Sequence, residues 1–230
     1  MPQDDYWNAL INALVEKEQI LGNRIERKEA QDHYLSLYFV RAEALKKIEK
    51  RKGHDPIEHG RQTTRYAYYT GKRIGLPKKE RILIEYAAEL HDIGKIDPRI
   101  PPDIWDKNGS LTPEERKIIE KHSLYSKEII TGKSDLTATK CNFSYIGDLA
   151  FYHHERPDGS GYICRLKSDE IPIGSAIISI IDVYNALTHW RPYKEPWPQE
   201  KALEELVRNK GTQFYPDIVD AFIDVIKTGS

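Results

Sequence analysis

Hydrophobic residues recur three and four positions apart along most of the chain, which is the spacing of one face of an α-helix. Near the N-terminus this spacing links two sets of residues, Trp7, Leu10, Ile11 and Leu14 and then Tyr38, Ala42 and Leu45. Convincing runs of alternating hydrophobic and polar residues, which predict strands, are absent from the sequence. The pattern therefore predicts an all-α fold built from amphipathic helices.

Proline and glycine residues set the limits of the predicted helices. One helix begins near Pro56 and carries His59 in its first turn, and another runs from about Pro77 to His91-Asp92. Gly94 is expected to terminate that second helix, because glycine is common just past a helix end.

A capping box marks the next helix start, where Thr112-Pro113-Glu114-Glu115 places proline at the first helical position. We expect this helix to continue far enough to put four residues on one face, Ile118, His122, Tyr125 and Ile129. Later helices are predicted through Tyr145, Leu149 and His153, ending in the glycine-rich loop after Glu155, and then over residues 173–187, 198–210 and 216–227. The helix over 173–187 is apolar on nearly every side, which predicts that it is buried.

The polar stretch 49–53 divides the chain. Residues 1–50 are predicted to form a helical appendage or lead-in, an element more typical of packing or homodimerisation than of a ligand site. Residues 51–230 are long enough to form the main domain with a hydrophobic core of its own.

Composition excludes several classes of protein. The 35 basic and 36 acidic residues nearly cancel, so no broad basic surface points to duplex nucleic acid. No segment resembles a signal peptide or approaches the roughly 20 apolar residues of a membrane span. Cys141 and Cys164 lack the spacing of metal ligands, and we interpret them as reduced residues of a cytoplasmic protein.

Two adjacent histidines, His153 and His154, give the strongest chemical signal. Neutral histidine is the commonest protein ligand of zinc, iron, manganese and related ions. Successive side chains on a helix are about 100° apart, close to the angle between neighbouring ligands of a six-coordinate metal. On the predicted helix, both imidazoles are therefore expected to reach one ion.

Further candidate ligands lie elsewhere in the chain, namely His59, His91, Asp92, His122 and Asp182. An isolated carboxylate such as Asp182 in an apolar helix costs several kcal/mol unless it is paired or coordinated. By itself, His122 on an apolar stripe is more typical of a hydrogen-bonded core histidine. The five histidines and two aspartates together predict a metal centre.

In chain order the sequence contains His59, His91-Asp92-x-Gly94-Lys95, Lys107-x-Gly109-x-Leu111-Thr112, His122, His153-His154-Glu155-x-x-Asp158-Gly159-x-Gly161-Tyr162, Asp182 and Arg191-Pro192-Tyr193. This order resembles the HD-GYP family of bacterial-type cyclic dinucleotide phosphodiesterases within the HD superfamily. The resemblance implies an HD-domain helical bundle, here with extra N-terminal helices. His122, His153 and His154 are the residues that distinguish this family from HD phosphohydrolases with one metal.

The resemblance implies two metal ions, one held by His59, His91, Asp92 and Asp182 and the other by His122, His153 and His154, with Asp92 bridging. Iron or manganese suits this mixture of nitrogen and carboxylate ligands. Some members bind a third metal through acidic residues that correspond here to Asp55 and Asn185. We expect two metals and leave the third open, because Asp55 is shorter than the usual glutamate and Asn185 is neutral.

The implied reaction opens cyclic di-GMP to pGpG and further to GMP. Two divalent cations lower the pKa of a shared water and neutralise charge on the phosphoryl oxygens. Asp92 and Lys95 have the implied catalytic roles, and the implied substrate contacts are Lys95, Tyr162, Arg191 and Lys194.

One position departs from the family's Gly-Tyr-Pro signature, where Ile163 replaces the proline. This change removes no ligand, so we expect metal binding and hydrolysis to be retained. Three alternatives stay open: a phosphodiesterase for another cyclic dinucleotide such as cyclic GMP-AMP, a general HD phosphohydrolase acting on nucleotides with one metal, and a sensor or scaffold that binds a dinucleotide without turnover.

Overall fold

A computed structural model describes residues 56–105, 107, 109–131, 143–189 and 195–229. The predicted helices of residues 1–50, and the homodimer contact expected there, lie outside these ranges. The described residues form helices and connecting loops without a strand, apart from one isolated bridge between Lys210 and Phe214. The all-α prediction is confirmed.

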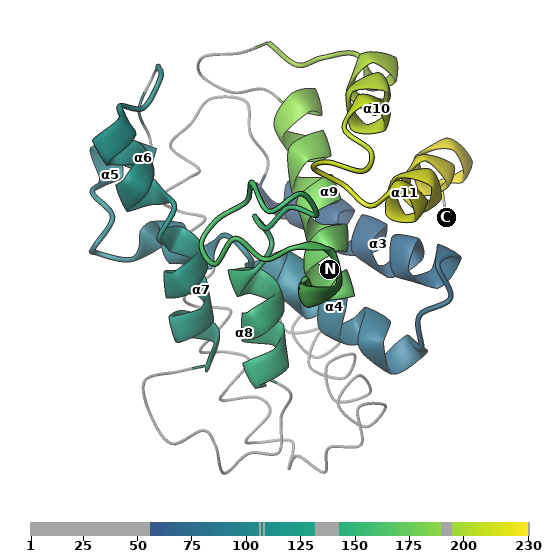
Figure 1. Cartoon of the computed structure of the whole chain (residues 1–230), viewed down its shortest axis with the longest axis horizontal. Helices are drawn as coiled ribbons and strands as arrows, with labels where there is room; N and C mark the ends of the chain where they lie inside the picture. Colours follow the sequence, from purple (N-terminus) through teal and green to yellow (C-terminus); the bar gives the residue numbers. More distant parts are fainter. Residues whose placement is uncertain (1–55, 106, 108, 132–142, 190–194, 230) are drawn as a thin grey trace, which may run out of the picture.

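The helices follow one another along the chain as α3 (Pro56–Arg73), α4 (Lys78–Leu90), α5 (Pro102–Trp105), α6 (Pro113–Ile119), α7 (His122–Thr131), α8 (Phe143–Phe151), α9 (Ile173–Thr188), α10 (Gln199–Arg208) and α11 (Pro216–Thr228). Two short 3-10 turns, η1 (Ile93–Ile96) and η3 (Ser168–Glu170), lie between them. The helices predicted to start near Pro56, Pro77, 198 and 216 are all present (Figure 1).

Helix α9 is the centre of the bundle. Helices α3, α4, α8, α10 and α11 pack against it, and Figure 1 shows it running through the middle of the molecule. Its isoleucines at 177, 178, 180 and 181 are all at most 1% exposed, and full burial of each such side chain contributes about 1.5–3 kcal/mol. The prediction of a buried helix is confirmed.

The predicted capping box at the start of α6 is confirmed. The Thr112 hydroxyl accepts the backbone N–H of Glu115 at 3.2 Å, and the Glu115 carboxylate accepts the N–H of Thr112 at 2.7 Å. These contacts satisfy two amide groups that a helix start otherwise leaves without partners.

The helix expected to continue from this start through residue 129 is wrong, because it breaks at Glu120 and Lys121 into α6 and α7. Nδ1 of His122 lies 2.7 Å from the carbonyl oxygen of Ile119. In a continuous helix, that carbonyl would accept the N–H of Ser123. The imidazole competes for the carbonyl, and the break places His122 at the first position of α7.

Two other details of the predicted elements are wrong. Helix α8 ends at Phe151, so His153 and His154 lie in the turn that follows and not on a helix. Helix α4 ends at Leu90, and Gly94 lies inside the turn η1 without the positive φ angle of a glycine that ends a helix. Nδ1 of His153 lies 2.6 Å from the carbonyl oxygen of Ala150, which in a continuing helix would accept the N–H of His154. Gly94 instead packs against the start of α7.

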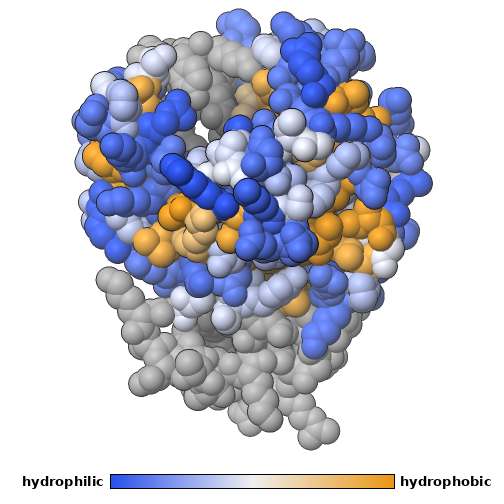
Figure 2. Space-filling model, in the orientation of Figure 1, coloured by the Kyte–Doolittle hydropathy of each residue, from blue (hydrophilic) through white to orange (hydrophobic). Residues whose placement is uncertain are grey.

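None of the described helices combines the length and the apolar character that a membrane crossing requires. Figure 2 shows one face of the molecule, where hydrophilic side chains cover most of the described surface and hydrophobic ones gather in separate patches.

The close approach of α9 to its neighbours depends on Gly174. A Cβ atom at this position would lie 2.8 Å from a side-chain carbon of Ile84 and 2.9 Å from one of Leu149. We expect Gly174→Ala to lower the free energy of unfolding, measured in urea, by about 1–3 kcal/mol, the usual cost of overpacking a core. The control is Gly71→Ala in α3, where the nearest atom is 3.1 Å away on the Arg81 stem, which can shift. Equal stability changes in the two variants would contradict this explanation.

Candidate metal centre

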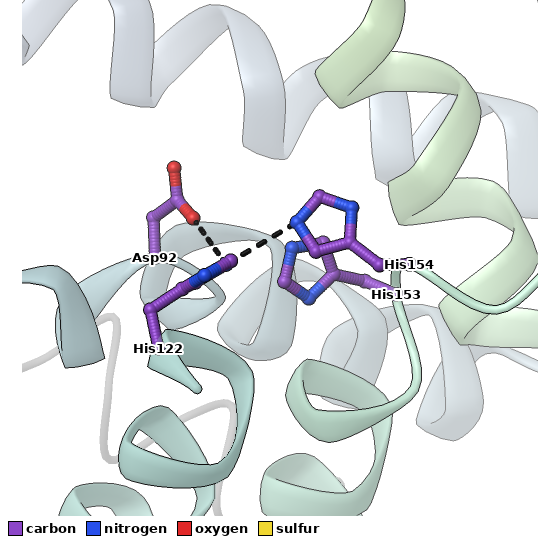
Figure 3. Close-up of side chains that lie close together, drawn as sticks. All are labelled: Asp92, His122, His153 and His154. Atoms are coloured by element: carbon purple, nitrogen blue, oxygen red, sulfur yellow. Dashed lines mark hydrogen bonds and ion pairs between the residues drawn. The ribbon is translucent and has the colours of Figure 1, made fainter. Parts of the chain in front are cut away.

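Six of the seven predicted metal ligands converge from four segments of the bundle. His91 and Asp92 follow the end of α4, His122 begins α7, His153 and His154 follow α8, and Asp182 projects from α9. Figure 3 shows Asp92, His122, His153 and His154 pointing toward one another. The seventh predicted ligand, His59, belongs to α3, but its side chain lies outside the described part of the chain.

The six side chains form two groups that share one residue. Asp92, His122, His153 and His154 make the first group, and His91, Asp92 and Asp182 make the second, with all ligand atoms of a group within 4.8 Å of one another. One oxygen of Asp92, Oδ1, lies 3.1 Å from Nε2 of His122, and the other, Oδ2, lies 3.6 Å from Nε2 of His91. Asp92 therefore presents one oxygen to each group.

Backbone carbonyls orient three of the histidines in the same way. Nδ1 of His91 lies 2.8 Å from the carbonyl oxygen of Ala88, and the corresponding distances are 2.7 Å from His122 to Ile119 and 2.6 Å from His153 to Ala150. A carbonyl oxygen only accepts hydrogen bonds, so each Nδ1 carries the hydrogen. In its neutral form, each ring then presents a lone pair on Nε2.

These Nε2 atoms point into the cluster. Nε2 of His122 lies 3.2 Å from Nε2 of His154, besides its approach to Asp92. The Nε2 atoms of His91 and His153 and Oδ1 of Asp92 are buried and have no hydrogen-bond partner among the described groups. Buried polar atoms without partners are costly, and a divalent cation accepts lone pairs from several of them at once. The arrangement therefore fits a metal site.

The electrostatics keep the first group ready to bind a cation. Burial lowers the pKa of His153, and burial together with the nearby His122 lowers the pKa of His154 to about 3. Both imidazoles are therefore neutral at neutral pH, as metal ligands must be.

The carboxylates at the cluster are ionised. Burial raises the pKa of Asp92, but Lys95, His91 and His122 together outweigh burial and hold this pKa well below its usual range. The pKa of Asp182 is also lowered, because its contact with His91 outweighs burial. Conversely, burial lowers the pKa of His91, but Asp92 and Asp182 outweigh it and raise that pKa. The ammonium group of Lys95 pairs directly with Oδ2 of Asp92, so it brings a positive charge to the cluster.

The contact of η1 with α7 explains why glycine is needed at position 94. The sequence alone did not reveal this role. A Cβ atom at Gly94 would collide with the backbone of His122 and Ser126. The Ser126 hydroxyl accepts the N–H of Gly94 at 2.8 Å and donates to the carbonyl of His91 at 2.6 Å. Gly94 and Ser126 therefore hold the His91-Asp92 turn against the start of α7.

Glu155 organises the loop that follows the paired histidines. This side chain is 2% exposed, and its carboxylate accepts the backbone N–H groups of Cys164 at 2.6 Å, Arg165 at 3.2 Å and Leu166 at 2.9 Å. Sequence reasoning assigned no role to Glu155, although a carboxylate beside two candidate ligands was a signal that could have drawn attention to it.

The remaining predicted site residues have different outcomes. The ring of Tyr162 lies on His154, with centroids 4.6 Å apart. Burial, together with Asp182 and Asp92, raises the pKa of its hydroxyl, so the phenol stays neutral. Asn185 is 3% exposed, and its amide nitrogen donates to the hydroxyl of Thr63 at 3.0 Å. Asp55, Arg191 and Lys194 lie outside the described residues.

Comparison with known proteins identifies the family. The model of the HD domain family matches residues 41–218, which is most of the chain. The chain belongs to the HD domain family, and the predicted resemblance is confirmed at that level.

Several curated relatives are similar to this chain. A cyclic di-GMP phosphodiesterase of Thermotoga maritima is 33% identical over 96% of the chain and 58% of its own length. A 3'3'-cGAMP-specific phosphodiesterase 2 of Vibrio cholerae is 38% identical over 73% of the chain and 31% of its own length. The cyclic di-GMP phosphodiesterase response regulator RpfG of Xanthomonas campestris is 39% identical over 66% of the chain and 38% of its own length. The chain therefore spans about a third to three fifths of these relatives.

A solved structure shares the fold. Bd1817, an HDG"Y"P protein from Bdellovibrio bacteriovorus, superposes with a TM-score of 0.58 at 16% identity, covering 92% of this chain and 68% of its own. At this identity, the likeness concerns the arrangement of the helices alone.

The anchoring of the loop by Glu155 can be tested with Glu155→Gln. The amide group offers one acceptor in place of two and turns its own donors toward backbone N–H groups, leaving at least one buried N–H without a partner. We expect the free energy of unfolding to fall by about 1–3 kcal/mol, and trypsin to cleave faster at Arg165 or Lys167. The control is Asp158→Asn in the same loop, where the carboxylate is exposed and accepts the N–H of Ser160 at 2.8 Å. Unchanged stability and proteolysis in Glu155→Gln would refute the anchoring role.

Proposed function

We propose that this chain is a metal-dependent phosphodiesterase that opens cyclic di-GMP to pGpG and further to GMP. The observation that carries the proposal is the position of Asp92 between two groups of ligand atoms. An HD phosphohydrolase with one metal needs only the group of His91, Asp92 and Asp182, with His59. The second group, formed by His122, His153 and His154, gives no advantage to such an enzyme.

The named activities of the relatives support the same class of substrate. Two of the three relatives described above are cyclic di-GMP phosphodiesterases, and the third is specific for 3'3'-cGAMP. A cyclic dinucleotide phosphodiester is common to all three. 3'3'-cGAMP is therefore the second candidate substrate.

The proposed ligands follow the two groups. His59, His91, Asp92 and Asp182 would hold one metal ion, and His122, His153 and His154 the other, with Asp92 shared. Iron or manganese suits the mixture of imidazole and carboxylate ligands. Asp55 and Asn185 are the places for a third ion. Because the Asn185 amide is neutral and Asp55 is shorter than the usual glutamate, two ions are the expected number.

The residues around the cluster have distinct proposed roles in hydrolysis. Bound divalent cations supply Lewis acidity, which activates water and neutralises phosphoryl charge. Asp92 fixes the spacing of the two groups. Lys95, at the edge of the cluster, carries the positive charge that attracts a substrate phosphate, and Arg191 and Lys194 are proposed to add to it. Tyr162 is proposed to contact the ligand.

The cytoplasmic location, the lack of duplex nucleic-acid binding and the homodimer through residues 1–50 stay predictions.

The metal content distinguishes the two-metal proposal from a general HD phosphohydrolase. Protein purified without oxygen is expected to contain two ions per chain by elemental analysis, chiefly iron or manganese. His153→Ala is expected to retain one ion, because it removes a ligand from only one group. His189→Ala, whose imidazole contacts the carbonyl of Asn185 outside both groups, is the control and is expected to retain two. One ion in the wild-type protein, or two in His153→Ala, would reject the two-metal site.

The substrate proposal is tested by chromatography of products after incubation of iron- or manganese-loaded protein with cyclic di-GMP, and separately with 3'3'-cGAMP. We expect linear dinucleotide from cyclic di-GMP. Asp92→Asn is expected to lower turnover by more than about 100-fold, because loss of this shared ligand exceeds the cost of losing an outer partner. The control is Asp103→Asn, an exposed carboxylate on α5.

The outcomes separate the remaining functions. Turnover of 3'3'-cGAMP alone would assign that substrate instead. Binding of either dinucleotide without any product would support the sensor or scaffold and refute the enzyme.

A further inference from the structure

His154 differs from the other three histidines of the cluster in what orients its ring. Backbone carbonyls three residues earlier hold His91, His122 and His153 through Nδ1. Among the described residues, no carbonyl holds Nδ1 of His154. Its Nε2 nevertheless points into the cluster, 3.2 Å from Nε2 of His122. Another contact must set its direction.

His154 lies in contact with other rings. The ring of Tyr162 packs on the His154 ring at a centroid distance of 4.6 Å and an interplanar angle of 32°. The ring of His153 also contacts His154, at a centroid distance of 3.8 Å. The backbone N–H of Tyr162 also donates to the carbonyl of His154 at 3.3 Å. An aromatic ring packed in this way restricts the rotation of the His154 imidazole. In the other three histidines, the hydrogen bond from Nδ1 to a backbone carbonyl has this effect.

The loop between these two residues is built to return Tyr162 to His154. A Cβ atom at Gly161 would lie 2.6 Å from the His154 carbonyl oxygen, Glu155 Cα and the Arg156 nitrogen, so only glycine allows the backbone to come this close. On the far side of Tyr162, Glu155 binds the N–H groups of residues 164–166. The backbone on both sides of Tyr162 is therefore fixed against the histidine turn.

We propose that Tyr162 is a positioning residue for His154, and that its aromatic face sets the affinity of the His122, His153 and His154 group for a divalent cation. The inference rests on the proposed function, since it assumes a metal in that group. It assigns the ring, rather than the hydroxyl, as the part of Tyr162 that matters. A role in substrate contact alone predicts that metal binding is independent of Tyr162.

The test compares Tyr162→Phe with Tyr162→Leu in the full chain, using manganese alone as the probe. Metal-free protein is titrated with Mn²⁺ against a competing chelator, and the two dissociation constants are fitted. Tyr162→Phe keeps the ring and is expected to bind both ions as the wild-type protein does. Tyr162→Leu is expected to bind one ion normally and the other about 10-fold more weakly, the usual effect of losing an outer-shell partner.

A matched control separates this effect from general loosening of the bundle. Tyr145 in α8 is partly buried against Glu80 and does not contact the cluster, and Tyr145→Leu is expected to leave both dissociation constants unchanged. Thermal melts of the metal-free variants check that each is folded. If Tyr162→Leu is unfolded, Tyr162→Met removes the ring with a more adaptable side chain and provides the same comparison.

Each result has one meaning. Unchanged metal binding in Tyr162→Leu, with a raised KM for the dinucleotide, would overturn the inference and leave the proposed function intact. Weak binding in Tyr162→Phe as well would overturn the role of the ring. A wild-type protein that binds only one ion would refute the two-metal site of the proposed function, and the inference with it.

Discussion

The candidate metal centre depends on one constraint, which is that an imidazole donating from Nδ1 to a backbone carbonyl presents a lone pair on Nε2. His91, His122 and His153 each meet this constraint through the carbonyl three residues earlier, although they belong to different segments. The local backbone therefore fixes the proton on each ring before the segments meet. The bundle then only has to bring the three turns to one place.

Bringing the three histidine-bearing turns together lowers the stability of the fold. Unpartnered Nε2 atoms and carboxylate oxygens lie close to one another in partly or fully buried positions, and such groups weaken a fold in the absence of a cation. The rest of the molecule offsets this cost. Four isoleucines of α9, at 177, 178, 180 and 181, are almost completely buried in the core, and α4 and α8 pack directly on that helix before they end in ligand-bearing turns. The same helix thus carries both buried isoleucines and the candidate ligand Asp182.

The local sequence pattern predicted most helices well and the turns between them poorly. The all-α fold, most helix starts and the capping box depend on residues within one segment, and these predictions are confirmed among the described residues. The break before His122 and the function of Gly94 depend on contacts between segments, such as that of Gly94 with the start of α7, which no local pattern contains. The candidate ligands came from the order of motifs, and their grouping around Asp92 needed the three-dimensional arrangement.

Ile163 differs from the two residues before it in its exposure to solvent. Gly161 is buried and Tyr162 packs on His154, whereas the side chain of Ile163 is 40% exposed. Of the three residues at the signature position, Gly161 and Tyr162 therefore form an inward pair that packs against the histidine turn. Ile163 is the outward residue, with its side chain in solvent. A search pattern that insists on proline at the outward position would therefore discard chains that retain the inward pair.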